Sequence, residues 1–99
     1  MRPMPRPAEY GQWDELPDVP EVPTSRMGDL AVLDVRERLI RLIDRRRSED
    51  ARIAELEQQW RERGGVGESP YEVSRQWVRR QTTEGALMLA GILDRLLRS

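Results

Sequence analysis

The sequence predicts an all-α fold, in which an antiparallel, coiled-coil-like two-helix hairpin follows an extended proline-rich N-terminal arm. Three observations predict it. Residues 10 to 24 carry an apolar side chain at every third position, two later segments carry apolar residues at spacings of three and four, and the glycine-rich stretch 63–67 separates those segments. The predicted organisation is an arm at 1–25 and a hairpin at 26–99, with helices at about 26–63 and 69–98 and a turn at 64–68.

The arm is predicted to adopt polyproline II structure, because its repeat of apolar residue, proline and polar residue matches the three residues per turn of that helix. Proline fixes its own φ and holds the preceding residue in an extended conformation. Such an arm presents an apolar stripe, which is useful only against another surface, and an acidic stripe of Asp14 or Glu15, Asp18 and Glu21. The alternative is a disordered acidic tail. The predicted partner-binding residues are Tyr10, Trp13, Leu16, Val19 and Val22.

The helix starts carry capping residues. Thr24, Ser25 and Asp29 are each able to cap the first helix, and the sequence leaves the choice open. The second helix is expected to start at Ser69 as the N-cap, with Pro70 in the first helical position and Glu72 completing a capping box.

The first helix carries a heptad-like apolar ladder that is interrupted by Arg46 and Glu49. When the helices are folded about the turn, these two residues lie beside Thr83 and Glu84 of the second helix. We therefore predict a polar register layer of Arg46, Glu49 and Glu84, which is a buried polar layer that fixes the alignment of the helices and the number of copies. The alternative is a water-facing patch where the two helices stand apart. Near the turn, Trp60, Trp77 and Tyr71 are predicted to pack in the seam between the helices, the alternative being a binding hot spot for a partner.

At the open end of the hairpin, both helices are apolar over more than one face. Two helices alone cannot bury that much apolar surface. We therefore predict that this end packs against a second copy or a larger host protein. The predicted interface consists of Val32, Leu33, Leu39, Ile40, Ile43, Met88, Ile92, Leu93 and Leu96.

Composition disfavours several classes of function. The 99 residues carry a net charge of −1, with no cysteine and no histidine, so thiolate nucleophiles, the usual general base and the commonest metal ligand are missing. We expect no enzymatic activity, no cofactor and no metal site. Neither a signal peptide nor a membrane span is evident, so a cytoplasmic location, or one within a particle assembled there, is expected. The repeat of Arg38, Arg45 and Arg52 is interspersed with acids, which disfavours nucleic-acid binding.

These observations predict an assembly or adapter subunit that docks through its apolar hairpin end and its arm, for example as a minor structural component of a virion or multisubunit particle. Two alternatives remain from other classes. One is a small regulator that sequesters a protein partner, as anti-sigma factors and antitoxins do. The other is an arginine-mediated binder of nucleic acid or nucleotide.

Overall fold

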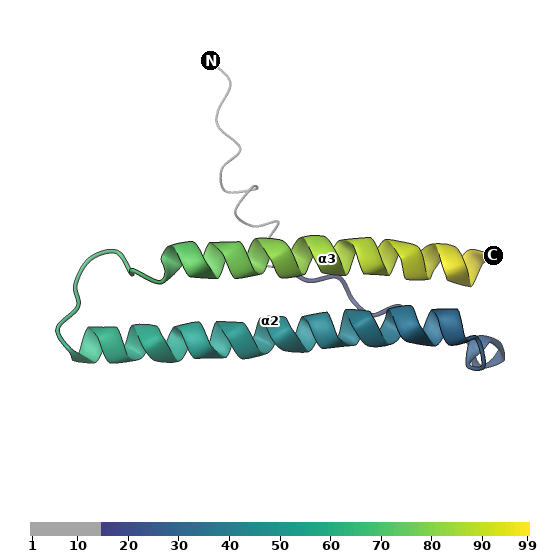
Figure 1. Cartoon of the computed structure of the whole chain (residues 1–99), viewed down its shortest axis with the longest axis horizontal. Helices are drawn as coiled ribbons and strands as arrows, with labels where there is room; N and C mark the ends of the chain where they lie inside the picture. The colour runs from purple at the N-terminus through teal and green to yellow at the C-terminus, as the bar shows by residue number, and fades with distance from the viewer. Residues whose placement is uncertain (1–14) are drawn as a thin grey trace, which may run out of the picture.

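The computed structural model describes residues 15–99, which fold into a hairpin of two long helices (Figure 1). A single turn of 3₁₀ helix, η1 (Thr24–Arg26), precedes α2 (Leu30–Glu62), and a glycine-rich turn leads into α3 (Glu72–Arg98). The two helices run side by side in opposite directions along their lengths (Figure 1). The structure therefore confirms the predicted all-α hairpin.

Asp29 is the N-cap of α2, which settles the choice that the sequence leaves open. Its Oδ1 accepts hydrogen bonds from the backbone N–H groups of Ala31 at 3.1 Å and Val32 at 3.4 Å. The helix begins at Leu30, later than the predicted residue 26, because η1 takes up the intervening chain. Two of the donors that a helix start leaves unpaired are thereby satisfied.

The start of α3 differs from the predicted capping box. Ser69 Oγ accepts from the N–H of Tyr71 at 3.1 Å, and Ser69 O accepts from the N–H of Glu72 at 3.3 Å. These bonds form a tight turn, so α3 begins at Glu72 and not at residue 69. The Glu72 carboxylate accepts from the side chains of Arg75 and Gln76 in the next turn, so it does not reach back to the cap.

Glycine is needed at three positions of the connecting turn. Gly64 and Gly67 have φ values of 90° and 83°, a region that other residues seldom occupy. Gly65 lies under the indole ring of Trp60, where a Cβ would come within 2.3 Å of a ring atom. Trp60 thus closes the end of the hairpin by packing on the turn.

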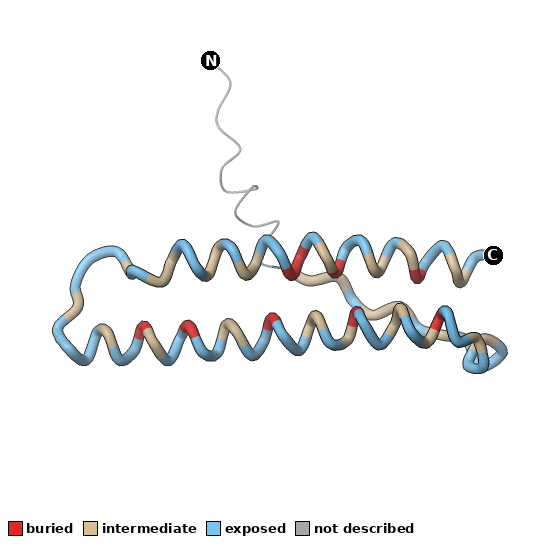
Figure 2. Tube along the Cα trace, in the orientation of Figure 1, coloured by how far each residue is buried: buried red, intermediate tan, exposed pale blue. Residues whose placement is uncertain are grey.

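The core lies in the open-ended half of the hairpin. Val32 and Leu39 of α2 and Ala86 and Leu93 of α3 are each 0% exposed and form one cluster. Figure 2 shows the buried positions of the two helices facing each other along the seam. Closer to the turn, Ile53 is the one further buried apolar residue among those that the structure describes.

The described part of the arm lies on the hairpin of its own chain. Leu16, Val19 and Val22 are partly buried against the core cluster, whereas Asp18 and Glu21 are exposed. At Pro23, φ is −57° and ψ is 146°, which are polyproline II values. Figure 1 shows this segment running from α3 across to the start of α2. The aliphatic residues that pack on the core thus recur at the predicted period of three over residues 16–22, and Pro17 and Pro20 beside them are also partly buried.

Candidate interaction site

Arg46 forms the centre of a buried polar layer halfway along the hairpin. The residue is 4% exposed, and its Nε donates to Asp50 Oδ2 at 2.9 Å. Its Nη1 donates across the interface to Thr83 Oγ1 at 3.1 Å and to Thr82 Oγ1 at 3.4 Å. Both threonines are themselves buried, so a charge in the core has hydrogen-bond acceptors on both helices.

Two of the three residues predicted for this layer have other surroundings. Glu84 is exposed and accepts from Arg80 of its own helix at 3.1 Å, one turn away. Glu49 is partly buried, and the buried layer takes the carboxylate of Asp50 instead. Asp50 Oδ1 also lies 3.7 Å from Arg79 Nε of α3, so this ion pair spans the two helices. The polar layer exists at Arg46, but the helix rotation selects Asp50 as its acid.

A second charged layer lies nearer the turn and was not predicted. Glu57 is 6% exposed and forms an ion pair across the hairpin with Arg75 of α3. Arg75 also pairs with Glu72 on its own helix. The sequence signal for this layer is that Glu57 follows the buried Ile53 by four residues, which places it on the core-facing side of α2. Arg75 thus bridges two carboxylates in the seam.

At the open end, Arg26 joins the start of α2 to the end of α3. It donates to the backbone carbonyl of Leu96 at 2.8 Å and to that of Ser99 at 3.1 Å, and to Asp29 Oδ2 at 2.9 Å. A cation is favourable at a helix C-terminus, where carbonyls lack partners. The hydrogen bond from Arg26, together with the bonds from the N–H groups of α2, lowers the pKa of Asp29 below its usual value of 3.8.

We expect the Asp29 carboxylate to make the stability of the hairpin sensitive to acid. Because its pKa is lower in the folded chain, its contribution is complete above pH 3.8 and is lost as pH falls through the folded pKa. Thermal unfolding of the wild type and of Asp29→Asn measures this, because asparagine can still cap the helix but does not titrate. The wild type should be the more stable near neutrality, and the difference in Tm should shrink in acid. A difference in Tm that stays constant with pH would contradict the assignment.

The residues predicted for the oligomer or host interface fall into three groups. Val32, Leu39 and Leu93 are 0% exposed, so they form the hairpin's own core and no partner can touch them in this conformation. Ile43 and Leu96 are partly buried against that core. Accessible surface remains at the other four positions, which are Leu33, Ile40, Ile92 and the 61% exposed Met88.

The arm residues predicted to bind a partner fall into two groups. Leu16, Val19 and Val22 pack on the hairpin of their own chain, whereas Tyr10 and Trp13 lie outside the described residues 15–99. The surplus apolar surface at the open end, which led us to predict a partner there, is thus partly covered by residues 16–22. Sequence periodicity shows that this segment has a surface to cover, but not to which molecule the surface belongs.

Exposed apolar side chains follow one face of α3. Trp77 is 60% exposed and Val73, one turn earlier, is 79% exposed. The same face continues through the Arg80–Glu84 ion pair to Leu87, which is 55% exposed. The prediction that Trp77 packs in the seam is therefore wrong, because the helix turns it outward, whereas Trp60 is partly buried. We call Val73, Trp77 and Leu87 the α3 apolar face.

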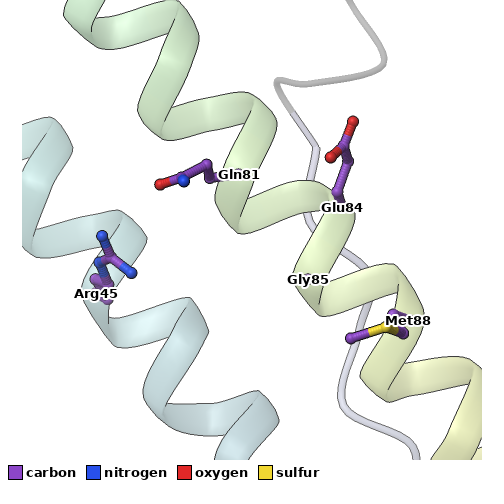
Figure 3. Close-up of a pocket in the computed structure, with 5 residues that line it drawn as sticks. All are labelled: Arg45, Gln81, Glu84, Gly85 and Met88. Carbon is purple, nitrogen blue, oxygen red and sulfur yellow. The ribbon is translucent and has the colours of Figure 1, made fainter.

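A shallow depression of about 440 Å³ lies beside Gly85 at mid-hairpin. It is lined by Arg45 of α2 and by Gln81, Glu84, Gly85 and Met88 of α3 (Figure 3). Leu42 of α2 lies close to Gly85, where an added Cβ would come within 2.7 Å of its Cδ2. Gly85 therefore permits close packing of α3 against Leu42 of α2.

Four exposed arginines are paired with carboxylates of their own helices. Arg38, Arg41 and Arg98 each pair with a carboxylate four residues earlier, at 3.0 to 3.2 Å. Arg80 pairs in the same way with the following Glu84. Around these four pairs the helix surface alternates in sign.

Residues 15–99 contain no helix long and apolar enough to cross a lipid bilayer, and no group of three or more acidic residues placed to hold a metal ion. The arrangement of side chains offers apolar surfaces and ion pairs, which are features of protein recognition. The chain matches none of the protein-family models, curated proteins or solved structures with which it was compared.

Proposed function

We propose that this chain is a non-enzymatic assembly or adapter subunit that binds a protein partner through the α3 apolar face. The observation that carries the proposal is the position of Trp77, which is 60% exposed. Most of the other large apolar side chains of this small hairpin are at least partly buried. Solvent-exposed tryptophan is enriched where proteins bind one another. Its neighbour Val73 extends the apolar surface by one helical turn.

The composition of this face also suits an interface. Apolar side chains stand at Val73, Trp77 and Leu87, and the Arg80–Glu84 ion pair lies between the last two. Protein interfaces are enriched in aromatic and arginine residues, and this face carries both. Of the seven large apolar side chains exposed in residues 15–99, four lie on α3, and three of these four form the α3 apolar face.

Sedimentation of the full chain tests the proposal. We expect association to depend on concentration, and the paired change Val73→Ser, Trp77→Ser to weaken it by roughly thirtyfold, because loss of a hot-spot tryptophan costs about 2 kcal/mol or more. Helicity by circular dichroism should be unchanged, since neither side chain is buried.

Leu30→Ser is the matched control, because Leu30 is 80% exposed but lies at the start of α2. It should leave association intact. A chain that stays monomeric at every concentration would favour the regulator over the assembly subunit. An equal loss of association in the Leu30 variant would show that the α3 apolar face is not the specific site.

A further inference from the structure

The arm segment Leu16–Val22 lies on a surface built by both helices. Its three inward-facing residues pack on the core cluster, which α2 supplies with Val32 and Leu39 and α3 supplies with Ala86 and Leu93. The residues between are proline or acid, and the acids Asp18 and Glu21 point to solvent. The hairpin surface therefore packs against the aliphatic side chain at every third position, with Pro17 and Pro20 also partly buried, and leaves the acidic side chains in water.

Apolar packing holds the described part of the arm, residues 15–22, on this surface. No backbone hydrogen bond joins residues 15–22 to either helix of the described chain. Burying half of an aliphatic side chain stabilises by about 1 kcal/mol, so Leu16, Val19 and Val22 supply only a few kcal/mol before the loss of chain entropy. A contact of this strength opens often.

The chain next to the arm is fixed independently of it. Arg26 binds the end of α3 and Asp29 caps α2, so η1 stays on the hairpin when residues 15–22 leave it. Lifting the arm would uncover apolar surface on both helices without unpairing a backbone group. The arm therefore has the properties of a removable cover.

From this geometry we propose that the surface under residues 16–22 is a recognition groove for an extended, proline-containing segment of another protein, with the chain's own arm as a built-in competitor. The partner segment carries an aliphatic or aromatic side chain at every third position. This deepens the proposed adapter function by naming the chemistry of a partner, but it uses a surface other than the α3 apolar face.

A foreign segment is a better occupant than the arm of a second copy. The second copy's arm offers the same three side chains as the tethered arm, so exchange gains no contact, while tethering gives the chain's own arm an effective concentration in the millimolar range. A partner segment with larger side chains at the inward positions buries more apolar surface and so displaces the arm.

Peptide binding to the full chain tests the proposal. The receptor is the triple variant Leu16→Asp, Val19→Asp, Val22→Asp, whose arm cannot compete, and the probe is a fluorescent peptide of residues 15–24 carrying Val19→Leu, which has the larger inward side chain expected of a partner segment. We expect the peptide to bind the triple variant roughly tenfold or more tighter than the wild type. A peptide with Asp at position 19 should not bind, and one with Ala at positions 18 and 21 should bind as well as the parent.

Failure of the peptide to bind a triple variant of unchanged helicity overturns the proposal, as does equal binding to wild type and variant. If the triple variant loses helicity, the single Val19→Asp chain serves as the receptor with the same expectation. If wild-type chain binds the variant as tightly as the peptide does and forms dimers, the occupant is a second copy and the foreign partner is excluded. Repeating the titration with Trp77→Ser added separates this groove from the α3 apolar face, because peptide affinity should not change.

Discussion

Replacing Arg46 with alanine should lower the free energy of unfolding by about 3 kcal/mol. The guanidinium is 4% exposed and bonds Asp50, Thr82 and Thr83, so its removal leaves a cavity and unpairs polar groups on both helices. Asp50 keeps about a third of its side-chain surface in water, which places the cost at the low end for a broken buried ion pair. Urea unfolding followed by circular dichroism measures the loss.

Arg45→Ala is the matched control, because Arg45 is the preceding residue and is exposed. It should change the free energy of unfolding by less than about 0.5 kcal/mol. Arg46→Leu fills the cavity without a buried charge and should therefore cost less than Arg46→Ala. Equal stability of the Arg45 and Arg46 alanine variants would show that the polar layer is open to water.

Leu39→Ala should cost about 3 kcal/mol, the middle of the range for truncating a buried leucine. Leu39 is 0% exposed in the cluster where both helices and the arm meet, so the cavity cannot be filled by solvent. The same substitution at Leu30, which is 80% exposed in the first turn of α2, should change stability by less than about 0.5 kcal/mol.

Chemical denaturation of the two leucine variants gives the comparison directly, because residue type, substitution and helix are the same. The Leu39 variant should also shorten the lifetime of arm docking, seen as faster proteolysis within residues 15–23. A loss below 1 kcal/mol at Leu39, measured against the Leu30 control, would show that the cluster is not the core.

Repeats and breaks in the sequence predict the backbone well. The period of three in residues 16–22 gives the inward and outward sides of the arm, and the glycines at 64–67 give the turn. The interruption of the apolar ladder gives the buried Arg46 opposite Thr83. Each of these features follows from the spacing of residues within a single segment of the chain, and so it can be predicted without knowing how the segments pack.

Rotation of a helix about its axis is harder to predict. Trp77 is large and apolar, so the sequence favours burial, yet α3 turns it outward and places Arg75 and Arg79 near the seam. Charged residues at core-facing positions look like surface residues until their partners are known, which is why the Glu57–Arg75 layer was missed. The surface on which the arm packs could not be predicted for a similar reason, since the local sequence pattern of the arm does not identify the surface that it covers.

The position of the core has a consequence for folding kinetics. The cluster of Val32, Leu39, Ala86 and Leu93 lies far from the turn, and Arg26 reaches Leu96 across 70 residues of sequence. The segment beside the turn, by contrast, is joined by the charged contact of Glu57 with Arg75. Pairing of the helices outward from the turn therefore forms few apolar contacts at first. The rate-limiting step must close a long loop, and its entropy cost is offset only when the distant apolar contacts form. This hairpin should collapse more slowly than helical proteins whose contacts are local.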